Sequence, residues 1–185
     1  MILLRHGQSE FNLHFSATRR DPGIEDPRLT PLGHEQAEAA AEALAGEDIR
    51  RILASPYTRA LQTAAPLARR LNLPVHVQPL VRERFAFACD IGSPTHALRA
   101  EWPDHDFDHV DTVWWPQEEE PTDAILARAR QFRGEMRDRP DWPHTVVVSH
   151  WGFILSLTGR SVMNGQWIRC DPTEEGPEAV NWHHG

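Results

Sequence analysis

The chain has 185 residues, 40% of them hydrophobic and 25% charged, which is enough for one compact domain with a substantial core, predicted to span residues 1–185. Its net charge of −8 argues against general nucleic-acid binding, which requires a concentrated basic surface. All 19 basic residues are arginine, so P-loop phosphate binding through lysine and Schiff-base catalysis are excluded.

The sequence has none of the features of a membrane or secreted protein. No apolar run approaches the ~20 residues that span a bilayer. Met1 leads directly into a predicted strand and leaves no room for a signal peptide. We therefore predict a cytoplasmic protein without membrane association. Cys89 and Cys170 lack paired spacing and are predicted to be reduced thiols. Neither is followed by arginine at the spacing that the C-x5-R loop of cysteine-dependent phosphatases requires.

Strands and helices alternate along the chain. Strands are predicted in chain order at 2–4, 49–54, 75–77 and 145–148. Helices are predicted over 31–46, 56–71, 122–139 and 152–158. Thr30-Pro31 and Ser55-Pro56 each combine an N-cap residue with proline at the first helical position, and Ser93-Pro94 predicts a further short helix. Such alternation favours an α/β fold with a mostly parallel sheet covered on both faces.

Two parts of the chain are less regular. The segment 85–121 holds several tryptophans among prolines and acidic residues, and we interpret it as a functional insertion or lid. The tail 171–185 is predicted to be irregular.

Chemically distinctive residues follow each predicted strand. In chain order these are Arg5-His6, Arg59 within the stretch SPYTRALQT, Glu83, and His150 within SHWG. The carboxyl ends of parallel strands meet at one edge of a sheet, where α/β proteins bind their ligands. Four separate segments are therefore predicted to converge on one anion-binding crevice.

The stretches 3–12, 55–63 and 147–152 resemble the signatures of the histidine phosphatase (phosphoglycerate mutase-like) superfamily, and 29–37 resembles the start of the family's first helix. The resemblance covers nearly the whole chain. It implies a three-layer α/β/α sandwich and a phosphatase that acts on a small phosphorylated substrate through a phosphohistidine intermediate.

The resemblance also implies a role for each residue. His6 would attack phosphorus, and Glu83 would protonate the leaving alkoxide and then activate water. Arg5, Arg59 and His150 would hold the non-bridging oxygens. The pocket would be lined further by Ser9, Asn12 and Gln62. With so much positive charge in the site, no metal and no other cofactor is required.

Trp151 departs from the family pattern, which commonly has glycine at this position, and is expected to narrow the pocket or to form a stacking wall. Two other functions stay open. One is a phosphoglycerate mutase-type phosphotransferase, although mutases of the family are longer. The other is a non-catalytic module that binds a phospho-ligand or phosphoprotein. No oligomeric state is predicted.

Motifs that would indicate other kinds of site are weaker. The stretch 106–110 fits the D-x-D-x-V motif of haloacid-dehalogenase phosphatases, but no buried apolar strand precedes it. The aspartates and histidines of 104–111 are a candidate cation site, for which a solvated loop is the favoured interpretation. His183-His184 are predicted to form an exposed end.

Overall fold

A five-stranded sheet forms the centre of the computed structural model, which describes residues 1–182. Its strands are β1 (Ile2–Arg5), β2 (Arg51–Ala54), β3 (Val75–Val77), β4 (Thr145–Ser149) and β5 (Trp167–Arg169). The strand order is β3-β2-β4-β1-β5, with β5 antiparallel to β1 and the other pairs parallel. The predicted mostly parallel sheet is confirmed.

Six helices surround the sheet in the described part of the chain. They are α1 (Glu10–Thr18), α2 (Pro31–Leu44), α3 (Thr58–Leu71), α4 (Thr95–Glu101), α5 (Thr122–Arg137) and α6 (Trp151–Thr158). Short 3-10 turns lie at Pro79–Val81, Ala88–Asp90 and Trp142–His144. The segments predicted to be helical are all helical, with ends that differ by a few residues.

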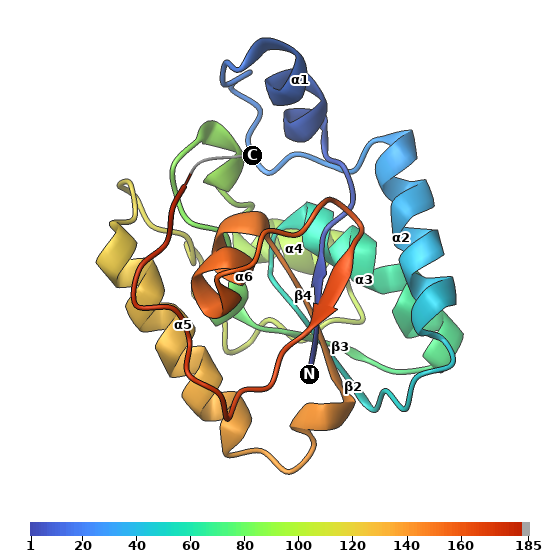
Figure 1. The fold of residues 1–185 in the computed structure, drawn as a ribbon. Helices are drawn as coiled ribbons and strands as arrows, with labels where there is room; N and C mark the ends of the chain where they lie inside the picture. Colours follow the sequence, from blue (N-terminus) through green and yellow to red (C-terminus); the bar gives the residue numbers. More distant parts are fainter. Residues whose placement is uncertain (183–185) are drawn as a thin grey trace.

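Alternation along the strands builds the two apolar layers. Ile2 and Leu4 pack into the core formed with α2 and α3, whereas Leu3, Leu53 and Val147 pack against α5 and α6. Figure 1 shows these two helix pairs on opposite sides of the sheet. The three-layer α/β/α sandwich is therefore confirmed.

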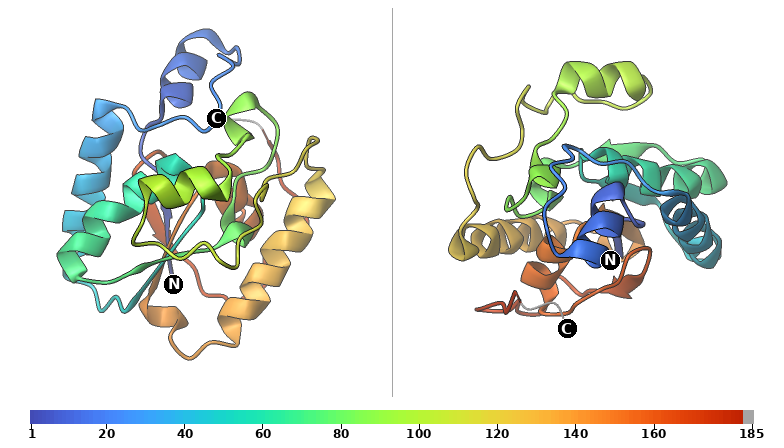
Figure 2. Two further views of the ribbon diagram at one scale, coloured as in Figure 1. Left: turned by 180° about the vertical axis from the view of Figure 1, so that it is seen from behind. Right: turned by 90° about the horizontal axis from the view of Figure 1, so that it is seen from above.

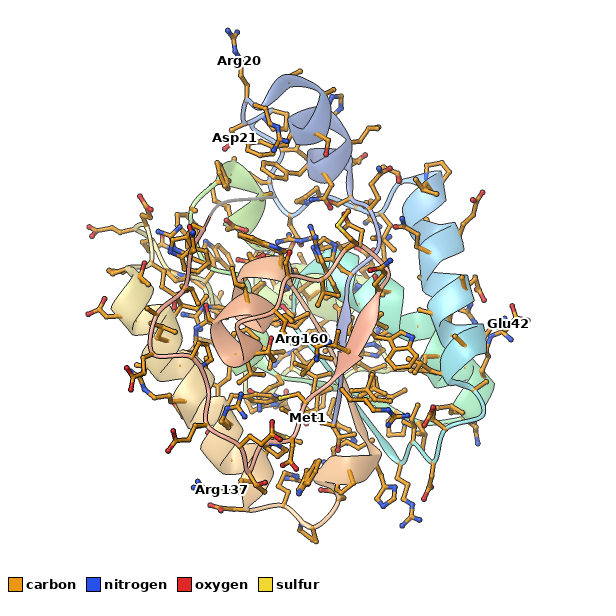
Figure 3. All side chains as sticks on the ribbon, in the orientation of Figure 1. Met1, Arg20, Asp21, Glu42, Arg137 and Arg160 are labelled. Carbon is orange, nitrogen blue, oxygen red and sulfur yellow. The ribbon has the colours of Figure 1, made fainter. Side chains whose placement is uncertain are left out.

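Helix α1 and strand β5 were not predicted from the sequence. Ser9 and Asn12 form a capping box at the start of α1, but Phe11 is its only fully buried residue, so the apolar periodicity is weak. Figure 1 shows α1 standing beyond the sheet, on the side toward which β1 runs, and Figure 3 shows Arg20 extending outward just after it. The three-residue strand β5 lies at the sheet edge and is only partly buried, so it leaves little pattern to detect.

The predicted cap at Ser55-Pro56 is wrong. Helix α3 begins at Thr58, with Tyr57 in the N-cap position. Asp26, from a distant loop, accepts hydrogen bonds from the Thr58 backbone N–H at 2.9 Å and the Thr58 hydroxyl at 2.7 Å. The Ser55 hydroxyl lies 2.8 Å from His150 Nε2 instead. Ser55 therefore belongs to the candidate site, and Asp26 caps the helix.

The segment 85–121 crosses one side of the molecule and contains α4 (Figure 2, left). Phe107, Val110 and Trp114 are buried in the same core as Tyr57. The motif at 106–110 lies in a loop without a preceding strand. Within residues 1–182, no group of three His, Cys, Asp or Glu side chains is arranged to hold a metal ion.

Two further predictions concern the end of the chain and membranes. His183-His184 lie outside the described residues. Across residues 1–182, no helix has the length and apolar character needed to cross a membrane.

Candidate active site

The predicted site residues meet at the carboxyl edge of the parallel strands. His6 directly follows β1, Glu83 follows β3 and a short 3-10 turn, and His150 directly follows β4. Two glycines let the loop after β1 approach the start of α2. A Cβ on Gly7 would lie 2.3 Å from the carbonyl oxygen of Gly33, and a Cβ on Gly33 would lie 2.0 Å from that of Gln8. Only glycine at both positions allows this contact.

His6 has the geometry of a nucleophile. Its side chain is 3% exposed, and Nδ1 lies 2.7 Å from the carbonyl oxygen of Gly7. A carbonyl only accepts, so Nδ1 carries the ring proton and Nε2 keeps its lone pair. Burial, together with the positive charges of Arg59 and Arg5, holds the pKa of His6 well below its usual value. The imidazole is therefore neutral at physiological pH.

Two arginines supply the positive charge beside His6, Arg59 fully buried and Arg5 partly buried. Arg5 donates through Nη1 to the carbonyl oxygen of Val162 at 2.8 Å, while its buried Nε has no hydrogen-bond partner among the described residues. Burial lowers the pKa of Arg5 to about 10, which still leaves it charged at neutral pH. Arg59 is 2% exposed and donates to the carbonyl oxygen of Cys89 at 2.8 Å.

Asp90 connects Arg59 to the backbone of residues 86 and 87. Its Oδ1 lies 3.4 Å from Arg59 Nη2, and its Oδ2 accepts the backbone N–H groups of Ala86 and Phe87, both at 3.0 Å. Burial raises the pKa of Asp90 to about 6, against the opposing effect of the Arg59 charge. Asp90 therefore positions both the arginine and the backbone of 86–90.

Glu83 is held at the start of α6. Its carboxylate accepts the backbone N–H groups of Gly152 at 3.1 Å, Phe153 at 3.2 Å and Arg84 at 2.8 Å. The helix N-terminus favours a carboxylate in this place. Gly152 leaves room for it, since a Cβ there would lie 2.5 Å from Glu83 Oε1.

Gly152→Ala is expected to displace the Glu83 carboxylate and to lower kcat for an alkyl phosphate about 10- to 100-fold, because small displacements of a catalytic group are costly. Its melting temperature is expected to change little, since the flexible end of Glu83 can move. Steady-state kinetics and thermal unfolding measure the two effects. Gly134→Ala on α5 is the matched control, because only Arg137 Nη2, 4.0 Å away, approaches the added methyl group. An unchanged kcat in Gly152→Ala would contradict this placement of Glu83.

His150 is fully buried beside the nucleophile. Its ring centroid lies 5.1 Å from that of His6, and its Nε2 lies 2.8 Å from Ser55 Oγ. Nδ1 is buried and has no hydrogen-bond partner among the described residues. Burial and the charge of Arg59 hold the pKa of His150 well below its usual value.

These two neutral histidines make stability depend on pH. In the unfolded chain they take up protons as the pH falls below about 6.5, whereas in the folded protein they do not. Their stabilising contribution is therefore complete above pH 6.5 and decreases below it, by about 1.4 kcal/mol per pH unit for each histidine. Denaturant unfolding between pH 7.5 and 5 is expected to show that the free energy of unfolding falls less steeply below pH 6.5 in His6→Ala than in wild type, and equally little above it. Equal slopes in wild type and variant would show that His6 is not buried in its neutral form; exposed His14→Ala is the control.

Most of the predicted residues share one pocket of about 110 Å³. It is lined by Arg5, His6, Ser9, Asn12, Arg59, Glu83 and Trp151, all of which were predicted. His150 and Gln62 do not line it. The Gln62 side-chain oxygen accepts the backbone N–H of Leu29 at 2.8 Å and so holds the loop before α2.

Sequence analysis missed several residues that support the site. Asn164 donates to the carbonyl oxygen of His6 at 3.0 Å and to Asn12 Oδ1 at 3.2 Å, and Thr63 accepts the backbone N–H of Gly7 at 3.1 Å. Trp182, near the end of the chain, lines the pocket. Asn164 and Trp182 lie in segments without a motif, so only the fold reveals them. Thr63 is the last residue of the stretch SPYTRALQT, so this motif could have indicated its role in the site.

A neutral imidazole beside two arginines, at the carboxyl edge of a parallel sheet, defines an enzyme of the phosphoglycerate mutase-like class. The chain belongs to the histidine phosphatase superfamily (branch 1), whose family model matches residues 1–174. It is a phosphatase, a hydrolase of phosphoric monoesters.

Related proteins agree with this class. The chain is 32% identical over 175 residues to the glucosyl-3-phosphoglycerate phosphatase of Mycobacterium tuberculosis (strain CDC 1551 / Oshkosh), an alignment covering 85% of this chain and 73% of the relative. Among solved structures, mycobacterial hydrolase 1 superposes with a TM-score of 0.64 at 28% identity, covering 90% of this chain and 86% of the other. A mycobacterial glucosyl-3-phosphoglycerate phosphatase in complex with VO3 gives a TM-score of 0.62 at 28% identity, covering 90% and 88%.

Proposed function

We propose that this phosphatase hydrolyses a small phosphomonoester, expected in the cytoplasm, through a phosphohistidine on His6 and without a metal ion. The observation that carries the proposal is the Nδ1–H bond from His6 to Gly7, which leaves Nε2 unprotonated beside Arg5 and Arg59. In the first step Nε2 forms a bond to phosphorus as the bond from phosphorus to the ester oxygen breaks. The departing oxygen takes a proton from Glu83.

The second step reverses the proton transfer. Water attacks phosphorus, its proton passes to Glu83, and the bond from phosphorus to Nε2 breaks to release inorganic phosphate. In the free site Glu83 accepts three backbone N–H groups, the arrangement of an ionised carboxylate. The proton for the first step therefore comes from the monoanion of the phosphomonoester, whose remaining proton dissociates near pH ~6. It passes from a phosphate oxygen to Glu83 and from Glu83 to the departing ester oxygen.

Positive groups stabilise the transferring phosphoryl group. Arg5 offers its unpartnered Nε–H, and Arg59 remains charged because nearby acidic groups, Asp90 among them, together offset the effect of burial and raise its pKa. His150 contributes through Nδ1, which lacks a hydrogen-bond partner among the described residues and would donate to a phosphate oxygen. With Ser55 donating its hydroxyl proton to Nε2, Nδ1 is the nitrogen that carries the ring proton.

The first test is hydrolysis of p-nitrophenyl phosphate in EDTA. Wild-type turnover is expected to be the same in EDTA and in added Mg²⁺, because the arginines supply the charge that a metal would otherwise provide. Activity lost in EDTA and restored by Mg²⁺ would contradict the metal-independent mechanism. Turnover of 3-phosphoglycerate to its isomer only with a bisphosphoglycerate primer would identify a mutase instead.

A further inference from the structure

One wall of the pocket is made of three phenylalanine rings. Phe11 and Phe15, one turn apart on α1, have ring centroids 5.1 Å apart, and Phe87 lies 5.5 Å from the first and 5.2 Å from the second. All three line the pocket, and Phe87 is 39% exposed. Asp21, just after α1, accepts the backbone N–H of Ala88 at 2.8 Å and so joins the two segments that carry these rings. The wall is therefore formed before substrate binds.

Two tryptophans line another part of the same pocket. The ring centroids of Trp151 and Trp182 lie 6.0 Å apart. Their indole N–H groups are both engaged within the protein, in Trp151 with Ser161 Oγ at 2.9 Å and in Trp182 with Thr122 Oγ1 at 3.0 Å. These side chains therefore offer aromatic carbon to a ligand, and the Arg84 guanidinium lies over the Trp182 ring, 4.7 Å from its centroid.

The charged groups beyond the phosphate-binding arginines do not favour an anionic leaving group. Arg84, which lines the pocket, pairs with Glu119 at 2.6 Å and donates to the carbonyl oxygen of Glu120 at 2.9 Å. A second anion on the substrate would have to compete with these contacts. The other charged side chains lining the described pocket, Glu83 and Asp90, are acidic and would repel it.

We infer that the substrate is a phosphomonoester of an uncharged, apolar alcohol, whose aromatic or alkyl group lies against the phenylalanine wall (Phe11, Phe15 and Phe87) and the Trp151–Trp182 pair. This substrate class rests on the proposed hydrolysis at His6. It excludes phosphoglycerate, with its carboxylate, as the preferred substrate.

The test compares kcat/KM for 2-phenylethyl phosphate, ethyl phosphate and 3-phosphoglycerate. The first two release primary alcohols of similar reactivity, so that any difference between them reports contact with the phenyl ring. We expect 2-phenylethyl phosphate to be preferred over ethyl phosphate about 10- to 100-fold, the effect of burying one ring against apolar side chains. 3-Phosphoglycerate is expected to be no better than ethyl phosphate.

The Phe87→Ala variant tests whether the phenylalanine wall causes the preference for the phenyl ester. We expect this variant to reduce the preference for the phenyl ester about 10-fold. The backbone N–H of residue 87 that binds Asp90 is retained, so the anchor of Arg59 stays in place. Leu13→Ala is the matched control, because Leu13 is exposed on α1 and does not line the pocket. It is expected to keep the wild-type preference.

The outcomes separate the two proposals. Hydrolysis of both alkyl esters with equal kcat/KM, or a preference for 3-phosphoglycerate, would overturn the substrate class while the proposed chemistry at His6 stands. A preference for the phenyl ester that Phe87→Ala leaves intact would overturn the assignment to the phenylalanine wall. Absence of turnover with all three esters and with p-nitrophenyl phosphate would overturn the proposed function and this inference with it.

Discussion

His6→Ala is expected to lower kcat for p-nitrophenyl phosphate by about 10⁴-fold or more, because the variant has no atom to accept the phosphoryl group. Neither Asn12 nor Ser9 is expected to replace it, since their side chains hydrogen-bond to each other at 2.9 Å. Arg5 and Arg59 remain in the variant, so it is expected to bind inorganic phosphate or vanadate. Release of nitrophenol, followed with binding of vanadate by calorimetry, measures both effects.

The control for His6→Ala is His14→Ala, a substitution of an exposed histidine on α1. It is expected to keep wild-type kcat. Loss of activity together with loss of vanadate binding in His6→Ala would show a disturbed pocket and leave the nucleophile unidentified. Activity retained within about tenfold of wild type would rule out His6 as the nucleophile.

Glu83→Gln is expected to separate the two steps of the reaction. Alkyl phosphates need a proton on the departing oxygen, so their kcat/KM is expected to fall about 10²- to 10⁴-fold. The p-nitrophenolate anion leaves without a proton, so its kcat/KM is expected to fall much less. Water activation is lost with both substrates, and the phosphorylated enzyme is therefore expected to accumulate. A burst of nitrophenol followed by slow turnover measures this accumulation.

The structural cost of Glu83→Gln is small, because the glutamine oxygen can still accept some of the backbone N–H groups that hold the carboxylate. Glu119→Gln is the matched control, since this carboxylate is exposed and pairs with Arg84 outside the reaction. Equal losses for alkyl and aryl esters in Glu83→Gln would remove Glu83 as the proton donor.

Much of the fold was predictable, because local sequence patterns indicate which strands are buried and where helices begin. β-Branched and apolar runs such as 145–148 are characteristic of buried parallel strands, and Thr30-Pro31 correctly marks the start of α2. The short strand β5 and helix α1 bury too few side chains to produce a periodic signal. At Ser55 the local pattern failed. The sequence favours a helix cap there, but the Ser55 hydroxyl forms a tertiary hydrogen bond with His150 instead.

The candidate site was predictable where a motif ends a strand, because topology then fixes the location. Seven of the nine predicted site residues line one pocket for this reason. Their chemical roles stay predictions. Contacts made by side chains from distant loops were not predictable, since nothing in the sequence near Asn164 or Trp182 indicates where those loops return. The contact of Asp90 with Arg59 was not predictable either, because it depends on how 86–90 folds around the Asp90 carboxylate.

The most direct test of a phosphohistidine on His6 is rapid-quench trapping of the phosphoenzyme with ³²P-labelled p-nitrophenyl phosphate. Wild type and Glu83→Gln are both examined, the variant because its second step is slowed. A phosphohistidine on His6 would give labelled protein that is stable in alkali and labile in acid, with up to one phosphate per chain in Glu83→Gln and the label on the peptide that contains His6. Unlabelled protein during turnover, or a label on a serine or on another histidine, would contradict it.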